Sequence, residues 1–131
     1  MIFIDSNVTM YVVGSDPEFR VRAERLCDEL VLTGKRLVTS AEVYQEILHR
    51  YRAINREVTI AHGFAHLDVL VDEVYPIERS DVRRAYEVVN GKRAIDARDA
   101  LHVAIMERYG ITQIASFDRG FDQIHGLERI S

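Results

Sequence analysis

The sequence predicts an α/β fold in which a central, mostly parallel sheet of four to five short strands is flanked by helices on both sides. Short apolar runs alternate with segments of helical periodicity along all 131 residues. Such alternation favours right-handed crossovers and a parallel sheet. Apolar residues make up 47% of the chain, which is enough to fill one core at this length. Residues 1–131 are therefore predicted to form a single domain.

The first half of the chain contains two predicted strands and three predicted helices. The strands cover residues 2–4 and 37–39, and the helices cover about residues 16–34, 43–51 and 56–71. Ile-Phe-Ile at the N-terminus is an apolar run typical of a strand buried on both faces. Asp16 followed by Pro17 is a helix-start signal, and Gly34 is expected to end that helix.

The second half contains three predicted strands and two predicted helices. The strands cover residues 74–77, 113–116 and 127–130. Pro76 indicates an edge strand or a strand end, because proline cannot donate a ladder hydrogen bond. Ser80 is expected to cap the helix that follows. The next helix runs from Asp96 to Tyr109, and Gly110 stops it.

The charge of the chain narrows its possible functions. The formal net charge is −4, whereas a protein that binds nucleic acid mainly through phosphate contacts is usually basic. Divalent cations held by clustered carboxylates would reverse the local sign. A single cysteine excludes an internal disulfide, and the sequence contains no signal peptide pattern and no apolar run long enough to span a membrane. We therefore expect a cytoplasmic protein with no membrane association.

Four acidic residues are expected to meet at one edge of the sheet. Asp5 ends the first strand and Asp118 follows the fourth, while Glu46 and Asp99 lie in early turns of helices. Ligands of parallel sheets bind beyond the carboxyl ends of the strands. Clustered carboxylates repel one another unless a cation neutralises them. Because no companion cysteine or well-spaced histidine set is present, the pattern predicts Mg²⁺ or Mn²⁺ rather than zinc.

Each acidic residue also has a structural interpretation. Asp5 has the position of a turn or N-cap residue. Glu42 fits a capping box that begins at Thr39, which makes Glu46 the better functional candidate. Asp96 and Asp99 both suit a helix start and are not separable from the pattern alone. Asp118 is favoured over Asp122 only because it follows a strand.

For several basic and histidine side chains, the sequence leaves more than one role possible. The pair His62 and His66 is expected on a solvated helix face, whereas His102 suits either the site or the core. The stretch Arg50–Arg56 is either an RNA- or partner-binding surface or a solvated helix end. The same choice applies to Arg83, Arg84, Lys92 and Arg93.

Four motifs in this order resemble PIN-domain ribonucleases of the VapC toxin type over nearly the whole chain. They are MIFIDSNVTMYVVG, LVTSAEVYQEILHRY, ARDALHVAIMERYG and ITQIASFDRGFDQIHGL. The resemblance implies candidate catalytic and metal-binding roles for Asp5, Glu46, Asp99 and Asp118. It implies auxiliary roles for Ser6, Asn7, Asp96 and Ser116. Thr9 departs from the apolar residue or proline expected at its position.

The resemblance further implies Mg²⁺- or Mn²⁺-dependent endonucleolytic cleavage of RNA by the toxin of a toxin–antitoxin pair. Its expected partners are an RNA substrate, a small VapB-like antitoxin and a second copy in a homodimer. The main alternative is a PIN scaffold that binds RNA or protein without catalysis. A receiver-like domain fits poorly because no lysine follows a late strand, and an aspartyl phosphatase fits worse because Asn7 stands where a second aspartate is needed.

Overall fold

The computed structural model describes residues 1–91 and 94–131. Lys92 and Arg93, two of the basic residues noted above, lie outside the described residues. The elements follow the order β1 (Ile2–Ile4), α1 (Ser6–Val13), α2 (Pro17–Leu32), β2 (Leu37–Ser40), α3 (Ala41–Ala53), α4 (Glu57–Leu70), β3 (Glu73–Tyr75), α5 (Arg79–Gly91), α6 (Ala97–Arg108), β4 (Gln113–Ala115), the 3₁₀ helix η1 (Arg119–Gln123) and β5 (Glu128–Ile130).

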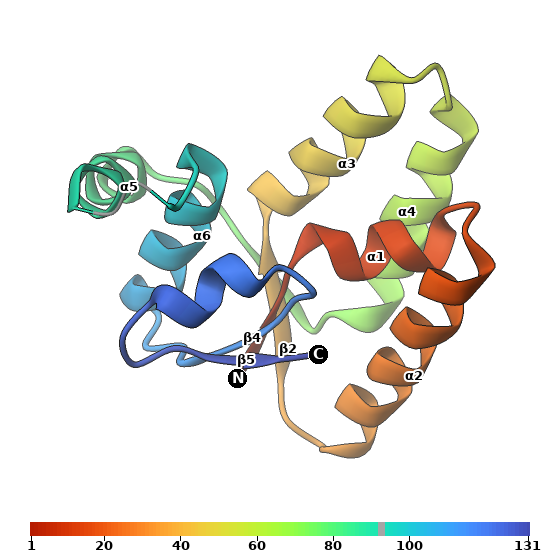
Figure 1. The fold of residues 1–131 in the computed structure, drawn as a ribbon, viewed down its shortest axis with the longest axis horizontal. Coiled ribbons are helices and arrows are strands. Elements are labelled where there is room, and N and C mark those ends of the chain that lie inside the picture. The colour runs from red at the N-terminus through yellow and green to blue at the C-terminus, as the bar shows by residue number, and fades with distance from the viewer. Residues whose placement is uncertain (92–93) are drawn as a thin grey trace.

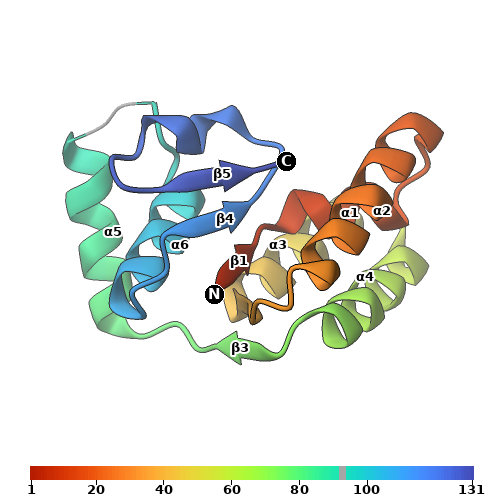
Figure 2. The ribbon, with the colours of Figure 1, turned by 90° about the horizontal axis from the view of Figure 1, so that it is seen from below.

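The described strands form one five-stranded parallel sheet in the order β3-β2-β1-β4-β5. Helices α1 to α4 lie together on one side of this sheet and α5 and α6 lie on the other (Figures 1 and 2). Pro76 directly follows β3, which is an edge strand as predicted. The predicted α/β class and the five strands are confirmed.

The middle strand β1 fixes the position of Asp5, the first acidic residue. Ile2, Phe3 and Ile4 are all fully buried between the two helix layers, as a continuous apolar strand should be. The backbone N–H of Asp5 donates to the carbonyl of Ala115, so the chain stays fixed to β4 one residue beyond the strand. The first acidic residue is thereby placed at the carboxyl ends of β1 and β4.

Three local predictions are corrected by the structure. Helix α1, which begins directly after Asp5, is not among the predicted helices. The capping box is wrong, because Ser40 occupies the N-cap of α3 without a side-chain bond and the Thr39 hydroxyl donates to the carbonyl of Ile4 instead. The Ser80 cap is also wrong, since Ser80 lies inside α5 and the buried Asp81 accepts from the N–H of Glu78.

The helices of the described residues are too short or too polar to cross a lipid bilayer. None of them combines the length and the apolar character that a membrane span needs.

Candidate metal centre

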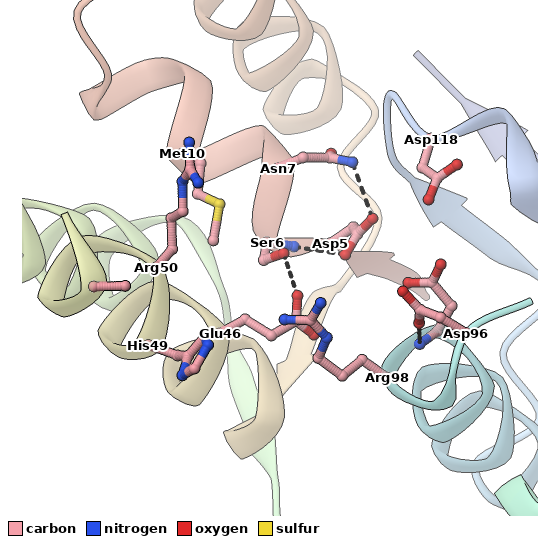
Figure 3. A pocket seen from close by; sticks show the side chains of 12 residues that line it. Asp5, Ser6, Asn7, Met10, Glu46, His49, Arg50, Asp96, Arg98 and Asp118 are labelled. Carbon is pink, nitrogen blue, oxygen red and sulfur yellow. Dashed lines mark hydrogen bonds between the residues drawn. The ribbon is translucent and has the colours of Figure 1, made fainter.

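A cavity of about 390 Å³ lies where β1 and β4 end, between the first turns of α1 and α6 and the inner face of α3 (Figure 3). Its walls contain all four acidic residues singled out from the sequence. The lining residues are Asp5, Ser6, Asn7, Met10, Glu46, His49, Arg50, Ala53, Asp96, Arg98, Asp99 and Asp118. The structure therefore brings together residues that are up to 113 positions apart in the chain, the distance from 5 to 118.

Asp5 is fixed from three directions. The backbone N–H of Ser6 donates to Oδ1 over 2.7 Å, and the Ser116 hydroxyl donates to Oδ2 over 2.6 Å. The Asn7 amide also donates to Oδ2 over 3.2 Å. Asp5 is thus the N-cap residue of α1 and a wall of the cavity at once. The structural and functional interpretations of this residue are compatible.

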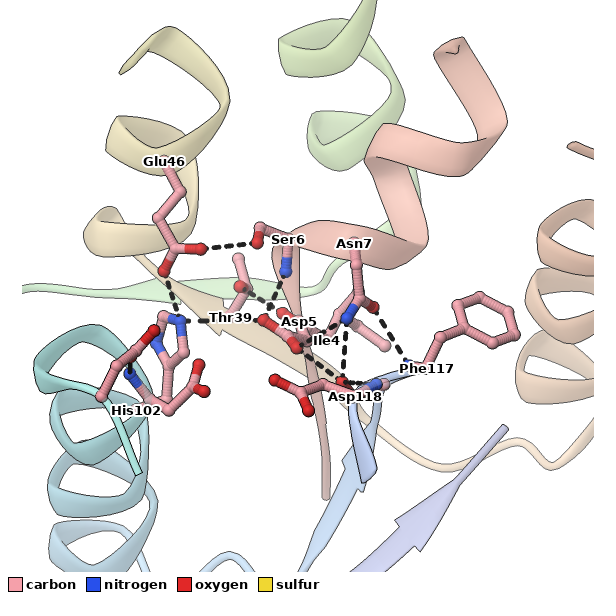
Figure 4. A network of polar contacts seen from close by, with 12 residues as sticks. Ile4, Asp5, Ser6, Asn7, Thr39, Glu46, His102, Phe117 and Asp118 are labelled. Carbon is pink, nitrogen blue, oxygen red and sulfur yellow. Dashed lines mark hydrogen bonds and ion pairs between the residues drawn. The ribbon is translucent and has the colours of Figure 1, made fainter. Parts of the chain in front are cut away.

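Asn7 and Ser116 join the end of β4 to helix α1. The Asn7 amide donates to the Ser116 hydroxyl over 3.1 Å, and its carbonyl accepts from the N–H of Phe117 over 3.1 Å. The Ser116 hydroxyl in turn accepts from the N–H of Asp118 over 3.0 Å (Figure 4). These bonds set the backbone that carries Asp118. Both residues therefore act on the acidic groups by orienting them, as expected of residues behind a metal site.

Asp99 and Asp118 enter the cavity from helix ends. Asp96 is the N-cap of α6, and its carboxylate accepts from the N–H of Asp99 over 2.8 Å. Asp118 caps η1 by accepting from the N–H of Gly120 over 2.8 Å. Asp96 and Asp99, which the pattern left inseparable, therefore differ in the structure. The capping role falls on the carboxylate of Asp96, whereas that of Asp99 caps no helix.

Glu46 approaches from α3 and is nearly buried, at 8% exposure. Its Oε2 accepts from the Ser6 hydroxyl over 2.6 Å. Its Oε1 lies 2.5 Å from Nε2 of His102, a fully buried histidine on α6. Glu42, the alternative weighed in the sequence, does not line the cavity.

The carboxylates of this site repel one another, and His102 offsets only part of that repulsion. Burial, followed by the charges of Asp96, Asp5 and Asp118, raises the pKa of Asp99 to about 7. Burial likewise raises the pKa of Asp5, although His102 opposes this. Burial would also raise the pKa of Glu46, but the contact with His102 outweighs it and lowers that pKa. A cation placed among these oxygens would relieve the repulsion.

The donor set suits a hard divalent cation. The cavity wall offers carboxylate oxygens, with the side chains of Asn7 and Ser6 beside them. The described chain offers no cysteine there, since Cys27 is buried elsewhere and burial raises its pKa to about 11. Carboxylate-rich sites are preferred by Mg²⁺ and Mn²⁺. Glu46 enters this set through its carboxylate, whose Oε1 is buried against His102.

Some features of the site were not singled out from the sequence. Arg98 and Met10 line the cavity, and Arg98 was visible only as the residue before Asp99. His49, which precedes the basic stretch Arg50–Arg56 in the sequence, lines it too. His66 corrects a prediction, because it is half-buried rather than solvated. Its Nδ1 lies 2.9 Å from the hydroxyl of Thr9, which explains the polar residue at that position of α1.

Known proteins share both the sequence pattern and the length of this chain. A family model described as the PIN domain matches residues 2–127. Ribonuclease VapC13 of Mycobacterium tuberculosis is 47% identical over 131 residues, covering 100% of both chains.

Solved structures show the same architecture. Mycobacterium tuberculosis VapC20, described as a sarcin-ricin loop cleaving toxin, matches with a TM-score of 0.73 at 20% identity over 93% of each chain. VapBC-1 from nontypeable Haemophilus influenzae matches with a TM-score of 0.70 at 18% identity, covering 100% of this chain and 98% of that one. The family match and the full-length relative decide the classification: the chain belongs to the PIN-domain family, among the VapC ribonucleases.

Proposed function

We propose that this protein is a Mg²⁺- or Mn²⁺-dependent endoribonuclease and the toxin of a toxin–antitoxin pair. The observation that carries the proposal is the convergence of Asp5, Glu46, Asp99 and Asp118 on one cavity. The elevated pKa of Asp99 supports it, because these carboxylates repel one another without a counter-ion. The name of the full-length relative, a VapC ribonuclease, points to RNA as the substrate.

The residues divide into two roles in this proposal. Asp5, Glu46, Asp99 and Asp118 would hold the ion, and Ser6, Asn7, Asp96 and Ser116 would orient them. A bound divalent ion supplies charge neutralisation at a phosphodiester and activation of water for its hydrolysis. The buried Asp5 and Glu46 are held in place by donors from the backbone and side chains, so little reorganisation is needed when the substrate binds.

The direct test is cleavage of mixed cellular RNA by the purified protein. We expect discrete products with Mg²⁺ or Mn²⁺ and none with a chelator. Without a cation, the carboxylates repel the negatively charged phosphodiester. Asp5→Asn protein prepared identically controls for contaminating nucleases, since asparagine also caps a helix. Tight metal binding without cleavage of any RNA would instead favour a catalytically silent binding scaffold.

The RNA path is proposed to follow the C-terminal end of α3 and the start of α4. A second cavity of about 250 Å³ shares Met10 and Arg50 with the acidic one and is also lined by Tyr11, Phe19 and Arg56. Tyr11 and Phe19 stack with ring centroids 4.6 Å apart. Neither Arg50 nor Arg56 has an acidic partner within the described residues, whereas Arg52 pairs with Glu57 at 2.7 Å. Arginines without an acidic partner beside aromatic rings suit the phosphates and bases of single-stranded RNA.

Removing the charges of Arg50 and Arg56 should weaken RNA binding while the four acidic residues stay in place. For the double variant Arg50→Gln with Arg56→Gln we expect about a tenfold loss of RNA affinity at low salt. The slope of log K against log salt concentration should fall by about 0.7 for each phosphate that is no longer neutralised. Fluorescence anisotropy of a labelled RNA in Ca²⁺ or chelator measures both. Arg52→Gln, on the same helix but outside both cavities, is the matched control, and an equal effect there would contradict the assigned path.

A small antitoxin is the proposed protein partner. The Haemophilus structural neighbour, VapBC-1, has this fold. The antitoxin would act by covering the acidic cavity. The homodimer stays a prediction.

A further inference from the structure

His102 is a buried polar residue to which the proposed function assigns no role. It lies on α6 one helical turn after Asp99 and is fully buried. Its ring packs against Phe3 of β1 with centroids 5.3 Å apart. It does not line the acidic cavity, so it lies behind the wall rather than in it.

The imidazole of His102 faces the carboxylates of two acidic residues. Its Nε2 lies 2.5 Å from Oε1 of Glu46 and 3.7 Å from Oδ1 of Asp5 (Figure 4). The other oxygen of Glu46 accepts from the Ser6 hydroxyl. The Glu46 carboxylate is therefore held between α1 and α6, although it belongs to α3.

Packing alone is a poor explanation for this histidine. Among the described residues, neither ring nitrogen of His102 has an aligned hydrogen bond, and neither has Oε1 of Glu46. A buried polar atom without a hydrogen-bond partner destabilises the folded state, and an aliphatic side chain at the same place would avoid that. Nε2 nevertheless lies 2.5 Å from Oε1 of Glu46, closer than its 3.7 Å distance to Oδ1 of Asp5. The contact with Glu46 is the reason for an imidazole here.

We propose that His102 is a positioning residue that fixes the Glu46 carboxylate from behind the metal centre. Nε2 faces Oε1 of Glu46 at 2.5 Å, a contact held by charge and proximity rather than by an aligned hydrogen bond, and Asp5 is a more distant second contact at 3.7 Å. His102 touches neither the ion nor the RNA and acts through Glu46. The inference rests on the proposed function only in assuming that these carboxylates bind a divalent ion.

Two amide variants separate this role from simple packing. The side-chain nitrogen of His102→Gln can reach the place of Nε2, whereas that of His102→Asn is one methylene too short. We expect His102→Asn to weaken Mn²⁺ binding and lower kcat by about 10- to 100-fold, with KM for RNA little changed. His102→Gln should restore most of both. Titration of free Mn²⁺ by electron paramagnetic resonance measures binding without any substrate, and His125→Asn, an exposed histidine outside the cavity, is the control.

A double-mutant cycle tests whether the effect runs through Glu46. In a Glu46→Gln background, His102→Asn should have almost no further effect on Mn²⁺ affinity. Equal losses in both backgrounds, or equal affinities in the asparagine and glutamine variants, would overturn the inference. Direct ¹⁴N coupling to bound Mn²⁺ that disappears in His102→Asn would also overturn it, because the histidine would then be a ligand.

These outcomes are separable from the fate of the nuclease proposal. Wild-type protein that binds Mn²⁺ but cleaves no RNA would end the nuclease proposal while the affinity comparison still stands. Wild-type protein that binds no Mn²⁺ would refute both. Thermal unfolding of each variant identifies any loss of folding, and the glutamine rescue then decides the role.

Discussion

Asp99→Asn is expected to lose RNA cleavage by about 10³-fold, a loss of about 4 kcal/mol of transition-state stabilisation. The carboxylate is half-buried and is not used in capping, since Asp96 caps the helix. Its negative charge is therefore free to hold a cation, and asparagine cannot replace that charge. Cleavage under single-turnover conditions with saturating Mn²⁺ measures the effect. Asp122→Asn, whose carboxylate pairs with Arg129, should cleave at the wild-type rate.

The same substitution should stabilise the metal-free protein. The pKa of Asp99 is raised to about 7 by burial and by Asp96, Asp5 and Asp118. The folded state therefore binds a proton more tightly than the unfolded state, so this carboxylate lowers stability as pH rises from about 4 through 7. Asparagine removes that penalty, by about 1 kcal/mol at pH 8 once solvent screening of a partly exposed group is included.

Opposite changes in activity and stability make the experiment decisive. Thermal unfolding in chelator should show a higher melting temperature for Asp99→Asn at pH 8 and no difference near pH 4. A variant that lost both activity and stability would have lost its fold. A variant that kept full activity would show that Asp99 does not hold the ion.

The sequence predicted the strands of the sheet but not helix α1, which begins directly after Asp5. The apolar run Ile2–Ile4 and its sequel at Asp5 located the central strand correctly. Helix α1 was missed because Val8, Thr9, Val12 and Val13 are β-branched and favour strands in isolation. In the protein, the Asp5 cap and burial of Val8 and Thr9 outweigh that preference. Tertiary contacts thus decide the local structure directly after the first acidic residue.

The acidic set was predicted because one topological rule places strand ends together. Asp5 and Asp118 meet because β1 pairs with β4, although the two strands are far apart in sequence. What the sequence could not show is how the carboxylates are held. Ser6 reaches across from α1 to Glu46 of α3, and His102 reaches Glu46 from α6. Such contacts depend on how three helices pack together, and the spacing of residues along the chain does not predict that packing.

Mn²⁺ affinity should fall steeply in acid, since the ion must displace a proton from Asp99. With a pKa of about 7 for that group, the dissociation constant should rise by about 25-fold between pH 7.5 and pH 5.5. The raised pKa of Asp5, caused first by burial, acts in the same direction. The lowered pKa of Glu46 leaves that carboxylate ionised over the range, so it contributes little to the slope.

Calorimetry provides an independent measure of the same displacement. In buffers of different ionisation enthalpy, Mn²⁺ binding should release about one proton at pH 6 and only about 0.1 proton at pH 8. Asp99→Asn should flatten both the affinity profile and the proton release, whereas Asp122→Asn should leave them unchanged. A dissociation constant that is independent of pH, with no proton release, would mean that the ion binds away from Asp99. The repulsion among these carboxylates would then be balanced by their neighbours Arg98 and His102 rather than by a metal.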